Sequence, residues 1–269
     1  MKTYFLETPS LEQFHWQFIQ WERREDILIL TLNAPERRNA LNPILLNELA
    51  YGLAYAQNEA TIRFVRLRAT GDIFCAGADL RAIIGGIEQT STVPQSQVPI
   101  VIDELFSAFE KPLIAEITGD VLAGGHLLIT GATFVIAPRS CRFSLPEVHR
   151  GLFPFQVMKA LAAFMPPRLV LNWCLLGESY TAEELFKWGI VTHLTESREE
   201  VFPTGDQLIE RLRLGAPLAF ERGIRAYHQL SSLSHADLNA LLLELAQSED
   251  AREGIIAFRE KRKPIWKGR

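Results

Sequence analysis

The sequence predicts an α/β protein with a helical carboxyl-terminal region. Three observations support this fold class. The 269 residues are 48% hydrophobic, which supplies one large buried core. Strand-like and helix-like segments alternate along most of the chain, whereas roughly the last 60 residues carry strong helix formers and no strand pattern. We therefore expect an α/β body over residues 1–200 and a helical region over residues 201–269.

The first strand and helix have clear boundary signals. Residues 27–32 are isoleucine and leucine with one threonine, and they run into an Asn-Ala-Pro turn. Asn42 is a suitable cap for a helix that begins at Pro43, because proline fits the first helical position. Leucine and alanine then recur on one face as far as Asn58. A strand followed by a helix is therefore predicted.

Two glycine-bearing turns punctuate the rest of the body. Residues 73–75 lead into the first turn, Gly-Ala-Asp at 77–79, and the second turn, Ala-Gly-Gly at 123–125, opens a helix. Further strands are expected over residues 62–67, 113–117, 133–136 and 190–192.

The connecting segments carry weaker signals. Residues 90–97 are rich in Gln, Ser, Thr and Pro, which predicts a mobile loop before a helix at about residues 100–109. Thr181 and Glu184 form a capping-box pattern, and the helix behind them is expected to end at Gly189.

Composition and charge exclude several classes of protein. The 28 Lys and Arg against 32 Asp and Glu leave a net charge of −4, which disfavours a nucleic-acid partner. Three widely spaced cysteines without a CxxC pair are typical of the reducing cytoplasm, where we expect this protein. The amino-terminal residues lack the apolar run of a signal peptide. The most apolar stretch, residues 121–137, is interrupted by glycine and histidine, so no membrane span is expected.

The common nucleotide, metal and hydrolase motifs are absent from the sequence. It contains no GxGxxG, no GxxxxGK[ST], no HExxH and no GxSxG. Its six histidines have no ligand spacing. We therefore expect neither a metal nor a separate cofactor.

The two glycine turns are the strongest chemical feature. Each follows a strand and precedes a helix, where the first amide groups lack internal partners and carry the positive end of the helix dipole. If the turns at 77–79 and 123–125 meet in space, their amides can stabilise a negative oxygen that develops on a carbonyl. A single turn of this kind would indicate only a tight connection.

Five blocks, in order, resemble the crotonase superfamily, the enoyl-CoA hydratase and isomerase group. They are RNAL at 38–41, FCAGADL at 74–80, KPLIAEITGDVLAGG at 111–125, FSLPEVHRGLFP at 143–154 and GESYTAEELFKWGIVTHL at 177–194. Residues 254–264 are similar to the family's closing helix. The resemblance implies a spiral of ββα turns, a helical trimerisation region, and a homotrimer or dimer of trimers. It also implies an acyl-CoA thioester as ligand, with coenzyme A as part of the substrate.

The resemblance assigns roles by position. The amides of Ala78 and Gly124 would hold the thioester oxygen as it becomes an enolate. Phe258 and Lys261 match positions that reach the coenzyme A of a neighbouring subunit, although a solvated basic tail is the alternative. Contacts to the bound substrate are implied for Arg38, Ala40, Leu41, Ala76, Asp79, Leu80 and Arg81. The two arginines could equally be surface residues, and the Asp79 side chain is expected to cap its helix.

The catalytic carboxylates depart from the hydratase pattern. Hydratases of this family use two glutamates; the second is present as Glu147, but the first position is Leu127. A leucine can neither orient nor deprotonate water. One glutamate suffices to move a proton from C2 to C4 of a 3-enoyl-CoA, and the isomerase branch resembles this chain in its apolar residue there. The alternative for Glu147 is an ion pair with Arg150 or Arg142.

The surroundings of Glu147 complete the prediction. An apolar acyl pocket would raise its pKa toward neutrality. We expect that pocket to include Leu152, Phe153, Phe155 and Val157. His126 and His149 are candidate proton relays, although a lone histidine in an apolar segment is more often structural.

The sequence thus predicts an enoyl-CoA hydratase/isomerase-type enzyme. Double-bond isomerisation fits Glu147 with Leu127 best, and hydration follows closely. Decarboxylation of an acyl-CoA and a non-catalytic acyl-CoA-binding scaffold are the alternatives.

Overall fold

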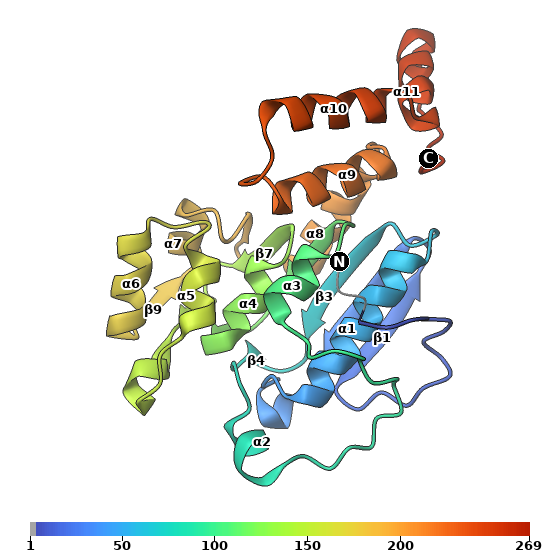
Figure 1. Cartoon of the computed structure of the whole chain (residues 1–269). Helices are drawn as coiled ribbons and strands as arrows, with labels where there is room; N and C mark the ends of the chain where they lie inside the picture. The colour runs from blue at the N-terminus through green and yellow to red at the C-terminus, as the bar shows by residue number, and fades with distance from the viewer. Residues whose placement is uncertain (1–3) are drawn as a thin grey trace.

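The computed structural model describes residues 4–269, except for the side chains of residues 83–85. Its strands form two sheets with helices packed around them (Figure 1). The larger sheet has the order β1 (Ile19–Arg24), β2 (Ile27–Leu32), β3 (Phe64–Ala69), β5 (Leu113–Glu116), β7 (Phe134–Pro138) and β10 (His193–Thr195). The smaller sheet has the order β4 (Ile73–Cys75), β6 (Asp120–Leu122), β8 (Arg142–Ser144) and β9 (Ser179–Thr181).

Both sheets are mixed. In the larger sheet β1 runs antiparallel to β2, and the remaining neighbours are parallel. In the smaller sheet β4, β6 and β8 are parallel, and β9 is antiparallel to β8. Parallel strands end at the same edge of a sheet, so the loops that follow them gather there.

Helices connect the strands and form the carboxyl-terminal region. In the body they are α1 (Pro43–Asn58), α2 (Leu80–Gly85), α3 (Ile102–Ser107), α4 (His126–Thr130), α5 (Phe155–Leu161), α6 (Pro167–Leu176) and α7 (Ala182–Lys187). The carboxyl-terminal helices are α8 (Val201–Leu212), α9 (Pro217–His228), α10 (His235–Ala246) and α11 (Glu249–Glu260). Short 3₁₀ helices are η1 (Pro35–Arg37), η2 (Ala123–Gly125) and η3 (Pro146–Arg150).

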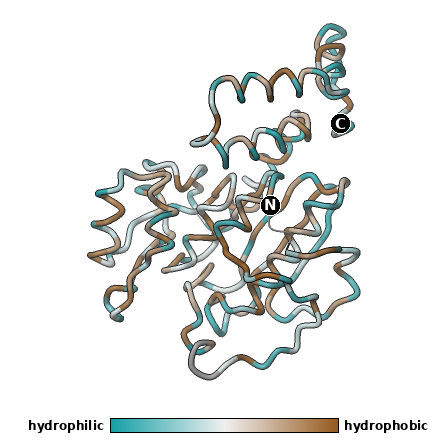
Figure 2. The backbone as a smooth tube through the Cα atoms, viewed as in Figure 1, coloured by the Kyte–Doolittle hydropathy of each residue, from teal (hydrophilic) through white to brown (hydrophobic). Residues whose placement is uncertain are grey.

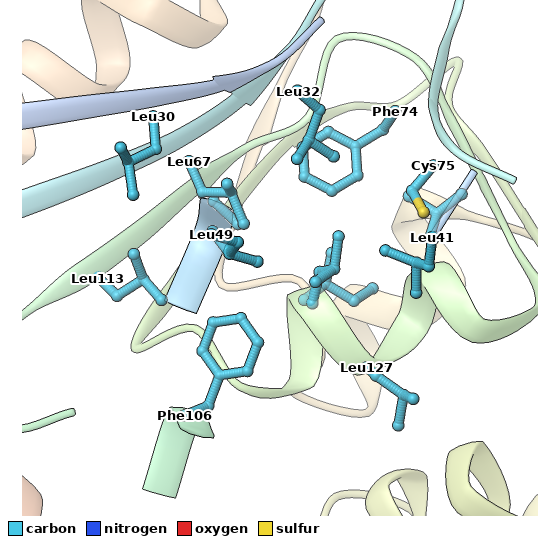
Figure 3. Packing of buried hydrophobic residues seen from close by; sticks show 14 of the residues in the cluster. Leu30, Leu32, Leu41, Leu49, Leu67, Phe74, Cys75, Phe106, Leu113 and Leu127 are labelled. Atoms are coloured by element: carbon cyan, nitrogen blue, oxygen red, sulfur yellow. The ribbon is translucent and has the colours of Figure 1, made fainter. Parts of the chain in front are cut away.

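The core lies between the larger sheet and the helices in front of it. Leu30 on β2 and Leu67 on β3 are fully buried and face Leu49 on α1 (Figure 3). Phe106 on α3 and Leu113 on β5 pack into the same cluster. Burying each such side chain contributes roughly 1.5–3 kcal/mol to the stability of the fold. The sheet therefore holds the loops at its edge in place.

Several sequence predictions are confirmed closely. The strand over residues 27–32 is β2, and the helix from Pro43 to Asn58 is α1. Asn42 caps α1 through its side-chain oxygen, which accepts hydrogen bonds from the amides of Ile44 and Leu45. The Thr181 capping box of α7 is also present.

Other element boundaries were wrong. The strand predicted at 62–67 lies at 64–69, and the one predicted at 190–192 is replaced by β10 at 193–195, because residues 190 and 191 pack into the core before pairing begins. The loop predicted as mobile is anchored at both ends. The amide of Thr90 donates to the Gln17 side chain, and the amide of Ser96 donates to the Asn47 side chain.

The carboxyl-terminal helices α9, α10 and α11 stand apart from the sheets (Figure 1). Hydrophobic residues recur along them (Figure 2), and several are strongly exposed. These include Leu242, Leu243, Ile255 and Phe258.

Candidate active site

The two glycine turns lie side by side because β4 and β6 are neighbouring parallel strands. A β-carbon built on Gly77 would lie 2.6 Å from Ala123 Cβ and 2.7 Å from Gly124 N. Gly77 also has a φ of +83°, which glycine adopts without a steric cost. The close approach of the turns at 77–79 and 123–125 therefore requires glycine at this position.

A bridge between Leu41 and Ala78 sets the direction of the Ala78 amide. Leu41 N donates to Gly77 O at 2.7 Å, and Asp79 N donates to Leu41 O at 2.9 Å. Successive groups of an extended chain point to opposite sides, so the Ala78 N–H points away from Leu41. Gly124 lies on that other side, where an added β-carbon would be 3.6 Å from Ala78 N.

Asn39 holds the segment that makes this bridge. Its fully buried side chain accepts a hydrogen bond from Ala34 N at 2.8 Å and donates to Thr70 O and Ile73 O at 2.9 and 2.8 Å. Its φ of +51° is in the left-handed region, which asparagine tolerates better than most residues. Sequence reasoning assigned it no role, since two of its three partners, Thr70 O and Ile73 O, are distant in sequence.

A cavity of about 430 Å³ opens beside the two amides. Three polar side chains reach it: Glu147, Arg150 and Gln156. The rest of the lining is small or apolar and consists of Ala76, Ala78, Leu80, Ala123, Gly124, Leu127, Leu152, Phe153, Pro154, Phe155 and Val157. The cavity lining therefore combines residues of the two glycine turns, one carboxyl group and an apolar wall.

Glu147 lies on η3 and is partly buried. Its Oε2 has no hydrogen-bond partner among the described residues, and neither Arg150 nor Arg142 lies within ion-pair distance. Burial raises the pKa of this carboxyl above its ordinary 4.5, against the opposing effects of its own amide and of Arg150. A carboxyl with these properties in a cavity suits a general base.

Leu127 stands in the first turn of α4 (Figure 3). It also lines the cavity. It is 7% exposed and belongs to the main hydrophobic cluster. Its side chain offers neither a proton nor an acceptor. Glu147 is thus the only carboxyl group among the described residues that line this cavity.

Comparisons with known proteins identify the family of this chain. The family model described as Enoyl-CoA hydratase/isomerase matches residues 22–269. The chain belongs to the enoyl-CoA hydratase/isomerase family. It is 31% identical to the 2,3-dehydroadipyl-CoA hydratase of Escherichia coli K12, over 92% of this chain and 97% of that protein. It is 30% identical to the enoyl-CoA hydratase EchA19 of Mycobacterium tuberculosis, over 92% and 96%.

Solved structures of the same family share the fold. The enoyl-CoA hydratase EchA1 from Mycobacterium marinum superposes with a TM-score of 0.83 at 30% identity, covering 94% of this chain and 99% of that one. The predicted crotonase fold, with its two mixed sheets and carboxyl-terminal helices, is confirmed. The prediction of an enoyl-CoA hydratase/isomerase-type enzyme is confirmed at the level of the family.

The residues that the crotonase resemblance assigned to substrate contacts surround the Ala78 turn. Ala76 and Leu80 line the cavity, whereas Ala40 and Leu41 are buried behind it. Asp79 caps α2 by accepting a hydrogen bond from Arg81 N at 3.0 Å, as predicted. The two arginines, Arg38 and Arg81, are exposed, and Asp79 also pairs with Arg37 at 3.3 Å.

The two candidate relay histidines of this crotonase chain lie outside the cavity lining. His126 is fully buried, and its Nδ1 hydrogen bonds to Ala123 O at 2.8 Å. A carbonyl only accepts, so Nδ1 carries the proton and Nε2 is an acceptor without a partner among the described residues. The His126 ring packs edge-on against Trp173. His149 is exposed and lies against Gly177.

Phe258 lies in the last turn of α11 and Lys261 follows that helix, which belongs to the carboxyl-terminal helical group (Figure 1). Neither residue lines the cavity. Phe258 is 85% exposed. The basic residues that follow α11 are not simply solvated, because Arg262 pairs with Glu253 at 2.6 Å and Lys267 with Glu249 at 3.1 Å.

Two absences apply to the described part of the chain. Within residues 4–269, no group of three His, Cys, Asp or Glu side chains could hold a metal ion. None of the helices seen there combines the length and apolar character that crossing a bilayer requires.

Proposed function

We propose that this family member acts on enoyl-CoA thioesters through an enolate. The amides of Ala78 and Gly124 donate hydrogen bonds to the thioester oxygen as negative charge develops on it, and Glu147 moves the proton. What supports this is their common position around one cavity with apolar walls. Preorganised donors in a site of low polarity stabilise such charge strongly, and one donor is typically worth about 10²–10³ in rate.

Double-bond isomerisation is the reaction that this set of groups fits best. Glu147 takes a proton from C2 of a 3-enoyl-CoA, the C2–H electrons delocalise into the thioester as a dienolate, and the same carboxyl returns the proton at C4. The product is the 2-enoyl-CoA. Only one carboxyl group is needed, which agrees with a leucine, Leu127, in the lining of the cavity.

Hydration is the second candidate, and the relatives favour it. The Escherichia coli and Mycobacterium tuberculosis proteins described above are both called hydratases. In this reaction water adds its hydroxyl group at C3 of a 2-enoyl-CoA and a proton at C2. Glu147 would have to serve both steps, because Leu127 cannot hold the water.

Deuterium exchange tests the proposal. The protein is incubated in D₂O with 2-enoyl-, 3-enoyl- and malonyl-type CoA thioesters, and label at C2 and C4 is measured by mass spectrometry. We expect label at both carbons of the 3-enoyl thioester and its loss in Glu147→Gln. Glu178→Gln is the matched control, since Glu178 is exposed and does not line the cavity.

The remaining outcomes separate the alternatives. Hydrated product from the 2-enoyl thioester, without label at C4, supports hydration. Loss of CO₂ from the malonyl-type thioester supports decarboxylation. Tight binding of coenzyme A thioesters without exchange on any of them supports a scaffold and contradicts the proposal.

We also propose that residues 201–269 assemble the chain into a homotrimer or a dimer of trimers. The exposed Leu242, Leu243 and Phe258 are apolar surface that a partner would cover. Light scattering measures the mass in solution, and the mass of a single chain at micromolar concentration would contradict assembly.

A further inference from the structure

Arg150 is an exposed cation in the lining of the cavity, and no described residue neutralises it. It lines the cavity with Glu147, and within the described chain no hydrogen bond or ion pair joins its guanidinium to another residue. The other lining residues around it, Leu152, Phe153 and Phe155, are apolar. Its five donors are therefore available to a ligand.

The helical geometry of η3 directs Arg150 to the same side as Glu147. The two residues are three apart in a 3₁₀ helix, in which side chains at this spacing lie above one another. With a rise of about 2.0 Å per residue, their backbones are separated by roughly 6 Å along the helix axis. The guanidinium is thus displaced along the cavity wall from the carboxyl group of Glu147 and does not cover it.

We propose that Arg150 binds a carboxylate at the far end of the acyl chain, so that the preferred substrates are enoyl-CoA thioesters that end in a carboxylate. This inference rests on the proposed function, because it takes Glu147 as the group beside the reacting carbons. A guanidinium pairs with a carboxylate through two parallel hydrogen bonds, which gives both strength and direction.

A plain alkyl chain fits this wall less well. Its terminal methyl group would displace water from Arg150 and from the Gln156 amide without replacing any of the lost hydrogen bonds. A terminal carboxylate restores those bonds. Glu147 does not compete for the guanidinium, since it lies beyond ion-pair distance.

Two measurements on the full chain test this inference. The first is kcat/KM for two enoyl-CoA thioesters of equal length, one ending in methyl and one in carboxylate. The second is the Kd of the corresponding saturated thioesters, which cannot be isomerised or hydrated. Wild-type protein is expected to prefer the carboxylate by about tenfold or more in both measurements. Hydrogen bonds to charged groups are worth this much.

Variants identify Arg150 as the cause. Arg150→Gln is expected to lower the preference ratio by about 10- to 100-fold, mainly through the KM of the carboxylate thioester. Arg150→Lys keeps the charge but loses the paired geometry, so it should give an intermediate ratio. Arg168→Gln is the control for net charge, because Arg168 is exposed on α6 and outside the cavity.

Each further outcome has a defined meaning. Equal treatment of the two thioesters by the wild type, or the same ratio change in Arg168→Gln, overturns the inference and leaves the proposed function intact. Failure to convert either unsaturated thioester overturns the proposed function, and the Kd ratio of the saturated pair then still decides the role of Arg150.

Discussion

Gly77 lies directly against the amide of Gly124: a β-carbon on Gly77 would be 2.7 Å from that nitrogen. Real β-carbons do not approach so closely, so a side chain at position 77 must push the two turns apart. The backbone donors proposed at Ala78 and Gly124 depend on this contact, although Gly77 itself donates nothing to the substrate in the proposed mechanism.

Gly77→Ala should therefore remove most activity. We expect kcat to fall by about 100-fold or more, because both donors shift away from the thioester oxygen. The matched control is Gly189→Ala. Gly189 has a similar φ of +78° but no neighbour within 4 Å of an added β-carbon. The Gly189→Ala variant measures the cost of backbone strain alone. An equal loss of kcat in both variants would contradict the role of the contact between Gly77 and Gly124.

Asn39→Ala should destabilise the fold and the site together. The substitution leaves the buried Ala34 N, Thr70 O and Ile73 O without their partner. We expect a loss of about 2–4 kcal/mol in the free energy of unfolding, measured with urea. Asn39→Asp keeps the acceptor for Ala34 N but turns an acceptor oxygen toward Thr70 O and Ile73 O and buries a charge, so its loss at neutral pH should be at least as large. A stability of Asn39→Ala within about 0.5 kcal/mol of the wild type would refute this account.

Local signals predicted much of this fold. Asn42 with Pro43 predicted the start of α1, and the Thr181 box predicted α7, because a cap acts within one helical turn. The three-residue strands β6 and β8 were not predicted. Strands this short have no period of their own, and they exist only through pairing with chain segments far away in sequence.

The start of α8 was also missed, for a physical reason. Pro203 and Gly205 are typical helix breakers, and strong helix formers were recognised only in roughly the last 60 residues, whereas α8 begins at Val201. Pro203 falls in the first turn of α8, where the missing amide costs little. Gly205 is required because a β-carbon there would overlap the carboxylate of Glu116, which pairs with the buried Arg66.

The candidate site likewise contains residues that the sequence predicted and one whose role it did not predict. The blocks that resemble crotonases placed Ala78, Gly124 and Glu147 together, since each lies within a continuous motif. Arg150 entered the sequence analysis only as an ion-pair partner. Arg150 lies on the same side as Glu147 only because η3 is a 3₁₀ helix. Residue composition does not distinguish such a helix from a loop.

Leu127→Glu tests whether the absent carboxyl group limits the reaction. Residue 127 lines the cavity with Glu147, so a glutamate there could hold and deprotonate water. We expect hydration of a 2-enoyl-CoA to rise by about 100-fold or more, with some loss of stability from burying a carboxyl group. Leu127→Gln has the same size without the proton transfer. An equal gain in Leu127→Gln would rule out this explanation.

The pH dependence of Glu147 should act in opposite directions on activity and stability. Burial raises its pKa, so exchange catalysed by the carboxylate should fall as pH drops through a value above 4.5. A raised pKa in the folded state contributes stability below the unfolded pKa, and this contribution is lost as pH rises through the folded pKa. The melting temperature of Glu147→Gln should therefore rise relative to that of the wild type as pH rises. The variant itself should be inactive. A variant that is less stable than the wild type at neutral pH would contradict this.

His126 should affect acid stability and leave the pH profile of catalysis unchanged. Burial lowers the pKa of His126 from 6.5 to about 4, because the ring is enclosed and Nε2 has no described partner. The folded state therefore keeps His126 neutral while the unfolded chain binds a proton, so the wild type should lose stability as pH falls from about 6.5 toward 4.

His126→Phe keeps the aromatic contact with Trp173 and removes the titrating group. Its free energy of unfolding should change less than that of the wild type over this pH range, even though the hydrogen bond to Ala123 O is lost at every pH. His149→Gln is the control, because His149 is exposed and does not line the cavity. If His126→Phe instead moves the acid limb of kcat/KM, His126 takes part in proton transfer, and its position outside the cavity lining must change during the reaction.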